Sequence, residues 1–289
     1  MMAIFKREFK SYFTNVSGVL FISVLLLFTG IFTTAINLLG QFSAFEYALE
    51  EVTLVFVLVV PVLCMRSFTE DKRMKTDSLL YALPLPLSSI VIGKYAAMLA
   101  VFLLPVAVMA LYPLLFAAFG AGAVNFASAY ASLFGFLLLG AALIALCMFL
   151  SSFTESQVIA AVSGFAVTLL LYFMNALSAM IPSNPLVSFF CFLVLACLAA
   201  AILYYLTKNL PVALTCGGIL CVPIVVLYVW KRTLFEGAFS ALLSSLAPFE
   251  RFYRFTYGIL DLKAVVFYLS FSAFFVFLTV KSLEKKRWS

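Results

Sequence analysis

Long stretches without a charged side chain are the feature that most constrains this chain. Residues 95–154 and 156–207 contain no Asp, Glu, Lys or Arg, and three shorter stretches, 11–45, 209–230 and 264–280, are also uncharged. Across the chain 66% of residues are hydrophobic and only 10% are charged, against about 25% charged residues in soluble domains. We therefore predict an all-α polytopic membrane protein in which lipid is the solvent for most of the apolar surface.

The uncharged stretches also predict how many helices cross the membrane. A transmembrane helix needs about 20 apolar residues, so each of the two longest stretches holds two helices. Neutral turns near Gly120–Gly122 and Pro182–Pro185 separate the two helices of each pair. We expect a single transmembrane domain, 1–289, with about eight spans, at 17–38, 47–66, 94–118, 127–151, 157–180, 187–206, 212–230 and 264–281.

The basic residues predict the orientation of the chain. With eight spans, both termini lie on one side, and most of the 18 Lys and Arg residues fall on that side. Basic loops favour the cytoplasm, so we expect both termini to be cytoplasmic. The net charge of +6 then complements anionic lipid headgroups and does not indicate a nucleic-acid partner.

The residue inventory excludes several functions. The chain has no His, which excludes Ser-His and Cys-His nucleophile pairs and the usual zinc sites, so we expect no catalytic residue and no metal site. Neither GxxxxGKS nor GxxxxGKT is present, so ATP has to be bound by a partner. A proton-coupled carrier needs acidic residues at mid-membrane depth. The nearest are Glu46, Glu50 and Glu51, which we interpret as ending the second span in water, with an outer mouth as the alternative.

Residues 1–13 have the spacing of an amphipathic helix. Aromatic residues recur at helical intervals on one side, while Glu8 and three basic residues take the other. We predict a helix on the inner leaflet; a plain flank of the first span is the alternative. The expected membrane-surface residues are Phe5, Lys6, Arg7, Phe9, Lys10, Tyr12 and Phe13.

Residues 66–94 form one long predicted cytoplasmic loop. Its middle favours a short helix with an apolar side, ended by Pro84 and Pro86 before Ser88 caps the third span. Because exposed leucines followed by prolines do not suit a solvated charged loop, we expect this helix to dock into another protein. The expected docking residues are Thr76, Asp77, Leu79, Leu80 and Leu83.

Two further segments carry site hypotheses. In the turn 151–157, Thr154 and Gln157 fit a capping box for the fifth span, and Glu155 is favourable at its N-terminus or available to a partner. The outer segment 231–263 has aromatic groups on both sides of Pro248. It predicts either a half-inserted hairpin that gates exit or a surface helix without that role. The possible outer-gate residues are Phe235, Phe239, Phe249 and Phe252.

Four segments carry a resemblance to a known family. They are FKREFKSYF near the start, the loop RSFTEDKRMKTDSLLYALPLPLSSIVIGK, LSSFTESQVIAA at 150–161, and DLKAVVFYLS followed by VKSLEKKRW at the end. Together they resemble an ABC type-2 exporter permease, which is a membrane-spanning subunit, and within that superfamily the gliding-motility branch of bacterial permeases. The resemblance covers roughly 1–180 and 231–288.

The resemblance implies an architecture and partners. It implies six spans, an amphipathic connecting helix at Phe5–Phe13, a cytoplasmic coupling helix at about Thr76–Leu83 and an outer re-entrant segment at about 233–258. Residues 187–230 depart from the pattern by adding two spans. ATP and Mg would be bound by separate ABC ATPase subunits. A second permease copy or a related membrane subunit would complete the transporter, with an auxiliary extracytoplasmic subunit as a further expected partner.

These implications define the expected function. We expect a permease subunit in the bacterial cytoplasmic (inner) membrane that is not itself an enzyme. It would couple ATP hydrolysis by its partner to export of a hydrophobic or amphipathic substrate. The alternatives are a non-transporting membrane scaffold that recruits cytoplasmic partners and an ATP-independent secondary carrier. The sequence leaves open the substrate and the choice between homodimer and heterodimer.

Overall fold

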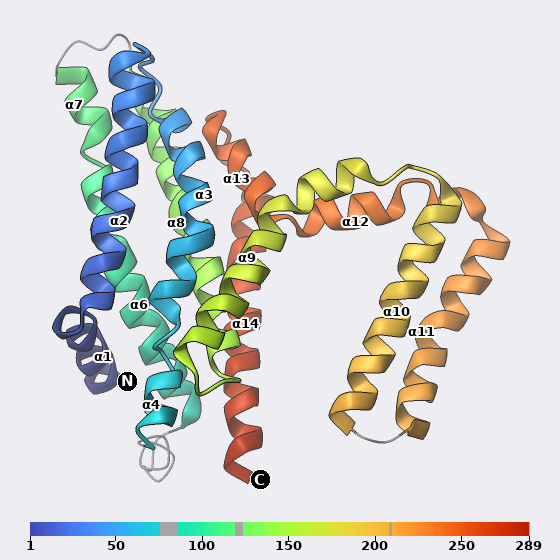
Figure 1. Ribbon diagram of the computed structural model, residues 1–289. Coiled ribbons are helices and arrows are strands. Elements are labelled where there is room, and N and C mark those ends of the chain that lie inside the picture. Colours follow the sequence, from blue (N-terminus) through green and yellow to red (C-terminus); the bar gives the residue numbers. More distant parts are fainter. Residues whose placement is uncertain (76–85, 119–123, 208–209, 289) are drawn as a thin grey trace. The chain divides into compact units, whose positions relative to one another are not determined.

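The computed structural model describes residues 1–75, 86–118, 124–207 and 210–288, which form helices and no β-strand (Figure 1). The predicted all-α class is confirmed for these residues. The helices are α1 (Met2–Thr14), α2 (Val16–Phe32), the π-helix η1 (Thr33–Leu39), α3 (Glu46–Cys64), α4 (Thr69–Arg73), α6 (Leu87–Met109), α7 (Tyr112–Ala118), α8 (Phe126–Ser151), α9 (Gln157–Met180), α10 (Pro185–Thr207), α11 (Leu210–Trp230), the 3-10 helix η2 (Arg232–Phe235), α12 (Ala238–Leu246), α13 (Pro248–Thr256) and α14 (Leu262–Trp288).

The helices group into two compact units. The first, which we call the main bundle, contains Met1–Tyr172 and Pro248–Ser289. The second unit, Phe173–Ala247, contains α10 and α11, which pack along each other. An added Cβ at Gly217 of α11 would lie 3.0 Å from the Cβ of Ala200 on α10, so this glycine permits a close helix approach. Residues 187–230, where two extra spans are expected, therefore lie in the second unit and not in the main bundle.

Among the described residues, six helical segments are long and apolar enough to cross a membrane. They are Val16–Leu39, Glu46–Arg73, Leu87–Ala118, Phe126–Ser151, Gln157–Met180 and Leu262–Lys285. A seventh is reached if Thr215–Trp230 and Arg232–Leu246, which meet at 119°, count as one bent span. The described residues thus make a multi-pass helical membrane protein. The six segments correspond to six of the eight expected spans, and the two extra spans stay a prediction.

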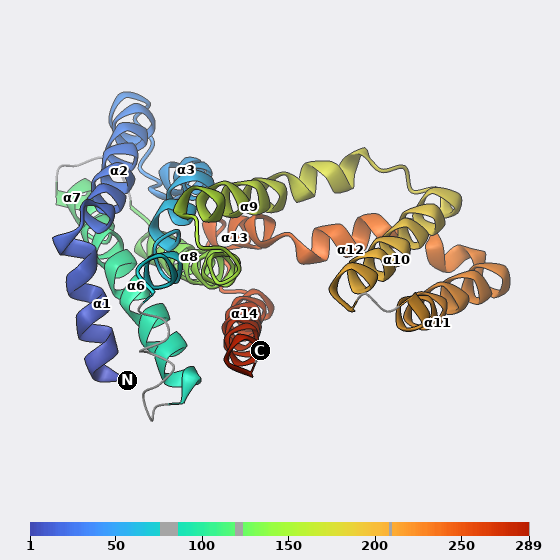
Figure 2. The same cartoon turned by 60° about the horizontal axis from the view of Figure 1, so that its bottom comes forward.

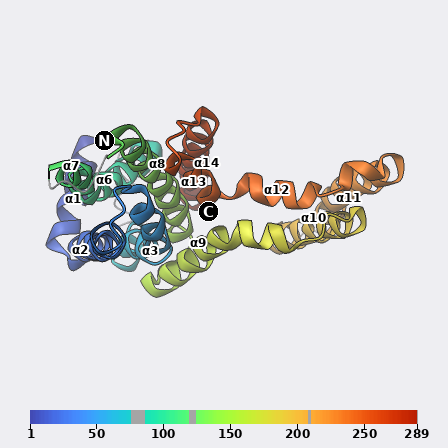
Figure 3. The same cartoon turned by 90° about the horizontal axis from the view of Figure 1, so that it is seen from above.

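The main bundle is built around α3 and α8, which carry buried residues along most of their length. Helix α2 packs on α3, and α6, α13 and α14 pack on α8, an arrangement that Figure 3 shows from above. Since α3 and α8 are surrounded by other helices, their side chains form a protein core. The outer helices α2, α9 and α14 turn many apolar side chains outward.

Aromatic rings fill the middle of this core. The ring centroid of Phe56 on α3 lies 4.3 Å from that of Phe136 on α8 and 5.6 Å from that of Phe102 on α6. All three side chains are fully buried. Aromatic pairs at these spacings contribute about 0.5–1.5 kcal/mol each beyond the burial of their area. The three central helices are therefore locked to one another at mid-height.

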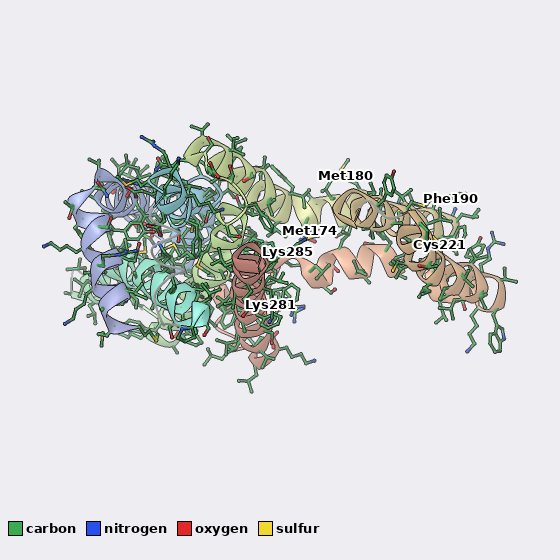
Figure 4. The ribbon with its side chains drawn as sticks, turned by 90° about the horizontal axis from the view of Figure 1, so that it is seen from below. Met174, Met180, Phe190, Cys221, Lys281 and Lys285 are labelled. Atoms are coloured by element: carbon green, nitrogen blue, oxygen red, sulfur yellow. The ribbon has the colours of Figure 1, made fainter. Side chains whose placement is uncertain are left out.

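The two ends of the main bundle differ. One end, called here the α4 end, holds α1, α4, the start of α6, the α8–α9 turn and both chain termini (Figure 1). Figure 2 shows α1 running beside α6 at this end, and Figure 4 labels Lys281 and Lys285 on the last turns of α14. The opposite end, called the α13 end, holds α7, α13 and the η1–α3 corner.

The glycine behind the Phe102 ring provides a test of this core. A Cβ added at Gly140 would lie 2.4 Å from two carbon atoms of the ring, which is confined by its aromatic neighbours. We expect Gly140→Ala to lower the free energy of unfolding by about 1–3 kcal/mol through overpacking. The measurement is thermal unfolding of the detergent-purified chain.

Gly30 of α2 is the matched control, because the nearest atom to its added Cβ is 4.0 Å away. Gly30→Ala should leave the stability unchanged or raise it by about 0.5–1 kcal/mol, as expected for Gly to Ala in a helix. Equal melting temperatures for the two variants would contradict the packing described for Phe102.

Candidate functional site: an ion-pair network at the α4 end

Helix α1 is confirmed, but the structure corrects which side faces inward. Ile4 and Tyr12 are buried, and Glu8 lies between them on the same face, with its side chain only 13% exposed. The predicted aromatic stripe does not share one environment. Tyr12 is buried, Phe5 and Phe9 are half-buried, and Phe13 is exposed. Glu8 was expected on the charged outer side. Glu8 faces inward because its carboxylate forms an ion pair with a buried cation on that side.

That cation is Lys94 of α6, whose side chain is 2% exposed. Its Nζ lies 3.1 Å from Oε1 of Glu8 and 2.7 Å from Oδ2 of Asp71, and it donates to the carbonyl of Ser67 at 2.5 Å. The ring centroid of Phe68 is 5.2 Å away. One ammonium group thus joins α1, α4 and α6.

The expectation that Lys94 marks the start of the third span is wrong. Helix α6 begins at Leu87, directly after Pro86, whose φ of −66° suits the residue before a helix. Pro86 occupies the N-cap position that was expected for Ser88. Lys94 therefore lies two turns inside the helix, and it is tolerated there because two carboxylates compensate its charge.

Arg7 completes the charge balance of the network. Its Nη2 lies 2.6 Å from Oε1 of Glu8 and 3.9 Å from Oδ1 of Asp71, so two cations face two carboxylates. Partial burial by itself lowers the pKa of Arg7, but the hydrogen bond to Glu8 and the charges of Glu8 and Asp71 raise this pKa above its ordinary value. The guanidinium stays charged at every accessible pH.

Lys72 extends the network to the α8–α9 turn. Its buried Nζ donates to the carbonyl of Ser152 and, at 3.4 Å, to that of Thr154. Carbonyls at a helix C-terminus carry partial negative charge and have no partner within the helix. Lys72 supplies a donor for them, and α4 is thereby tied to the end of α8.

A small polar pocket lies beside the network. It holds about 10 Å³, close to the space of one water molecule. Burial raises the pKa of its Tyr12 hydroxyl well above the ordinary value, so this group stays neutral. The pocket wall includes Glu8, Ser11, Tyr12, Arg66, Ser67 and Glu70.

The predicted docking residues fall outside the described part of the chain. These are Thr76, Asp77, Leu79, Leu80 and Leu83. The segments on either side of them are described, and both belong to the network: Asp71 and Lys72 precede the docking segment and Lys94 follows it.

Glu155 is exposed in the α8–α9 turn, where a partner could reach it. The predicted cap at Thr154 is wrong, because α9 begins at Gln157. Oγ1 of Thr154 accepts from the N–H of Ser156 at 3.1 Å, and Oγ of Ser156 in turn accepts from the N–H of Ile159 at 3.5 Å. Ser156 is therefore the N-cap residue.

The four outer-gate candidates belong to different units. In the second unit, Phe235 and Phe239 pack against Phe192 of α10, with ring centroids 6.0 and 5.3 Å apart. In the main bundle, Phe249 lies 5.1 Å from Tyr172, and Phe252 lies 6.2 Å from Phe136 in the aromatic core. The expected hairpin divides between Ala247 and Pro248, because these two residues belong to different compact units.

The carboxylates at the start of α3 are also placed differently from expectation. Glu46 is buried, and Oε1 of Glu50 accepts a hydrogen bond from Oγ1 of Thr256 on α13 at 2.6 Å. Of these three residues only Glu51 is exposed, as expected for a residue that ends a span in water. The interpretation as a solvated span end is therefore wrong for Glu46, whereas Glu50 is half-buried and bonds to α13.

The network residues Glu8, Asp71, Lys72 and Lys94 were missed as a site. Charged residues in a membrane protein mostly lie in loops, because unpaired charges are costly in a membrane. A signal was nevertheless present: Pro86 starts a helix that continues without interruption through Lys94. A lysine two turns inside an apolar helix requires a carboxylate partner.

The network predicts unequal effects for two lysine substitutions. Lys94→Met leaves Glu8 and Asp71 without their buried cation, so we expect the free energy of unfolding to fall by about 3–5 kcal/mol. Adding Asp71→Asn should recover part of this loss. The measurement is a double-mutant cycle of thermal unfolding on the detergent-purified chain.

Lys281 is the matched control, since its Nζ is also 2.7 Å from a carboxylate, that of Glu284, but its side chain is 55% exposed. An exposed pair contributes about 0.2–1 kcal/mol, so Lys281→Met should cost far less than Lys94→Met. Similar losses in the two variants would show that burial does not distinguish the pairs.

Comparison of the chain with family models, with curated proteins and with solved structures gives no match. The family resemblance therefore rests on the sequence segments alone.

Proposed function

We propose that this chain is the membrane permease subunit of a bacterial ABC type-2 exporter and has no catalytic activity of its own. The observation that carries the proposal is the ion-pair network. It joins α1 to both flanks of the 76–85 segment and to the α8–α9 turn. The first two are the places where the resemblance implies a connecting helix and a coupling helix, and the third is the turn in which Glu155 is available to a partner.

A buried network at this position suits a mechanical role. Its charges are held by short contacts between different helices, so a force applied to the 76–85 segment is passed to α3 and α6 together. These two helices continue into the aromatic core, where Phe56 and Phe102 are in contact. Closure of an ATPase dimer beneath the segment would then move two packed spans as one lever.

Prolines provide bend points along the same path. Pro61 lies inside α3 and Pro105 inside α6, and a proline in a membrane helix removes one backbone hydrogen bond. Gly164 of α9 packs against Pro61, because a Cβ added there would lie 3.0 Å from the proline Cβ. Movement at this bend would reach α9 as well.

The placement of buried charges favours this proposal over a secondary carrier. In the described residues the buried charged side chains are Glu46, Lys72 and Lys94. Lys72 and Lys94 lie at the α4 end and Glu46 at the α13 end, while the middle of the bundle is aromatic. A proton relay across the membrane requires ionisable groups at intermediate depth.

The proposal assigns an orientation and partners. The α4 end would face the cytoplasm of a bacterial cell, with ABC ATPase subunits, carrying ATP and Mg, below it. The apolar outer faces of α2, α9 and α14 would meet lipid and a second permease subunit. The Phe-rich spans favour a hydrophobic or amphipathic substrate.

The decisive test is purification of the full chain in mild detergent from its native cell. We expect an ATP-binding protein with a phosphate loop to co-purify. Leu80→Asp should abolish this association while leaving membrane insertion intact, because the new carboxylate would be buried in the docking surface. The readout is the ratio of ATPase to permease in the purified complex, measured by mass spectrometry.

Leu260→Asp is the matched control. Leu260 is exposed in the α13–α14 connection at the opposite end of the main bundle, so this variant should retain the ATPase. Absence of an ATPase from the wild-type complex, or its full retention by Leu80→Asp, would refute the proposal. A complex containing other cytoplasmic proteins would instead favour the scaffold.

A further inference from the structure

Three buried oxygen atoms lie in the corner between α2 and α3, at the α13 end. Thr33 and Asn37 are the buried residues of the π-helix η1, and Glu46 is the first residue of α3. Their exposed fractions are 3%, 3% and 5%. Each carries one buried side-chain oxygen that has no hydrogen-bond partner among the described residues. We call these three residues the η1 oxygen site.

The orientation of Asn37 is fixed by its surroundings. Its Nδ2 donates to the carbonyls of Phe42 and Ala44 at 2.8 and 2.9 Å. Turning the amide over would place Oδ1 against two carbonyl oxygens, so the assignment follows from chemistry. Oδ1 therefore points away from both carbonyls as an acceptor. The same two bonds fold the loop back onto η1 and bring the chain to within two residues of Glu46.

Thr33 differs from the threonines next to it. The hydroxyls of Thr29 and Thr34 donate to the carbonyls four residues earlier, at 2.7 and 2.8 Å. Oγ1 of Thr33 makes no such bond. Thr33 and Asn37 are four residues apart on η1, which places both on one face, and π-helical turns of this kind are frequent at functional sites.

Glu46 brings a negative charge to the corner. Among the described residues no Lys or Arg nitrogen is recorded within 4.0 Å of its carboxylate, and Oε2 has no hydrogen-bond donor. Glu46 is the first residue of a 19-residue helix, where the positive end of the helix dipole attracts negative charge. A buried anion in a membrane protein requires a compensating positive charge.

We infer that the η1 oxygen site binds a monovalent alkali cation, Na⁺ or K⁺, because three buried oxygen atoms without partners occur where η1 meets α3. A carboxylate, an amide oxygen and a hydroxyl are hard oxygen ligands of the kind that such cations prefer over nitrogen or sulfur. One carboxylate neutralises one charge, whereas a divalent ion would leave an excess charge buried. The bound ion would hold η1 against the start of α3.

This site is independent of the proposed ATPase coupling, which involves the opposite end of the main bundle. It would make the packing of the α2–α3 corner depend on the ions on that side of the membrane. Phe45, the residue before Glu46, is fully buried and stacks on Tyr112 at 5.5 Å with an interplanar angle of 6°. Loss of the cation would therefore loosen the contact between α3 and α7.

The test is thermal unfolding of the purified full chain in NaCl, KCl or choline chloride at equal ionic strength. A ligand that binds the folded state raises the melting temperature with saturation. We expect a saturable rise in NaCl or KCl and none in choline chloride. The salt with the lower half-saturating concentration identifies the preferred ion, and ²³Na NMR line broadening of the same sample gives a direct readout for Na⁺.

Two variants and a control complete the test. Glu46→Gln removes the charge and Thr33→Val replaces the hydroxyl by a methyl group of the same shape. Each should raise the half-saturating concentration at least tenfold. Glu51→Gln, which alters an exposed carboxylate of the same helix, should leave it unchanged. The use of two variants keeps the result interpretable if one fails to fold.

Three results would overturn the inference. The first is an identical melting temperature in all three salts. The second is an unchanged half-saturating concentration in both Glu46→Gln and Thr33→Val. The third is a Glu46→Gln protein that is as stable in choline chloride as the wild type in saturating NaCl or KCl, because this would mean that Glu46 is held as a neutral acid.

Discussion

The main bundle depends on one electrostatic constraint at its α4 end. An ammonium group that is 2% exposed is stable only where carboxylates surround it, because the desolvation of an unpaired ion costs several kcal/mol. Lys94 meets this requirement with Glu8 from α1 and Asp71 from α4. The pairing determines which face of α1 is turned inward, where α4 is placed and how α6 approaches both.

Different kinds of interaction hold the two ends and the middle of the main bundle together. Charged groups hold the α4 end, fully buried aromatic rings hold the middle, and a second polar layer with Glu46, Glu50 and Thr256 lies at the α13 end. Directional contacts at the ends fix the register of the helices, while the rings of Phe56, Phe102 and Phe136 fix their separation. Such a body can move as a unit when one end is displaced, which is the property that the proposed coupling to an ATPase requires.

Many of the helices could be predicted from the sequence. A charged side chain in lipid is costly, so the membrane-spanning helices appear in the sequence as long uncharged stretches. The uncharged stretches predicted α8, α9 and the start of α14 to within two residues, and the aromatic spacing predicted α1. The same reasoning failed at Lys94 and Glu46. It assumes that a charged side chain lies in water, whereas Lys94 is buried and paired with Glu8 and Asp71, and Glu46 is buried at the start of α3.

The sequence by itself determined that this chain is helical and multi-pass, because hydrophobicity and helix length are local properties of the polypeptide. Only the tertiary structure decided that Glu8 faces inward, that Lys94 joins three helices and that the outer aromatic segment divides between two units at Pro248. Those features depend on contacts between residues such as Glu8 and Lys94, which lie far apart along the chain. Periodicity within one helix carries no information about which distant side chain will meet it.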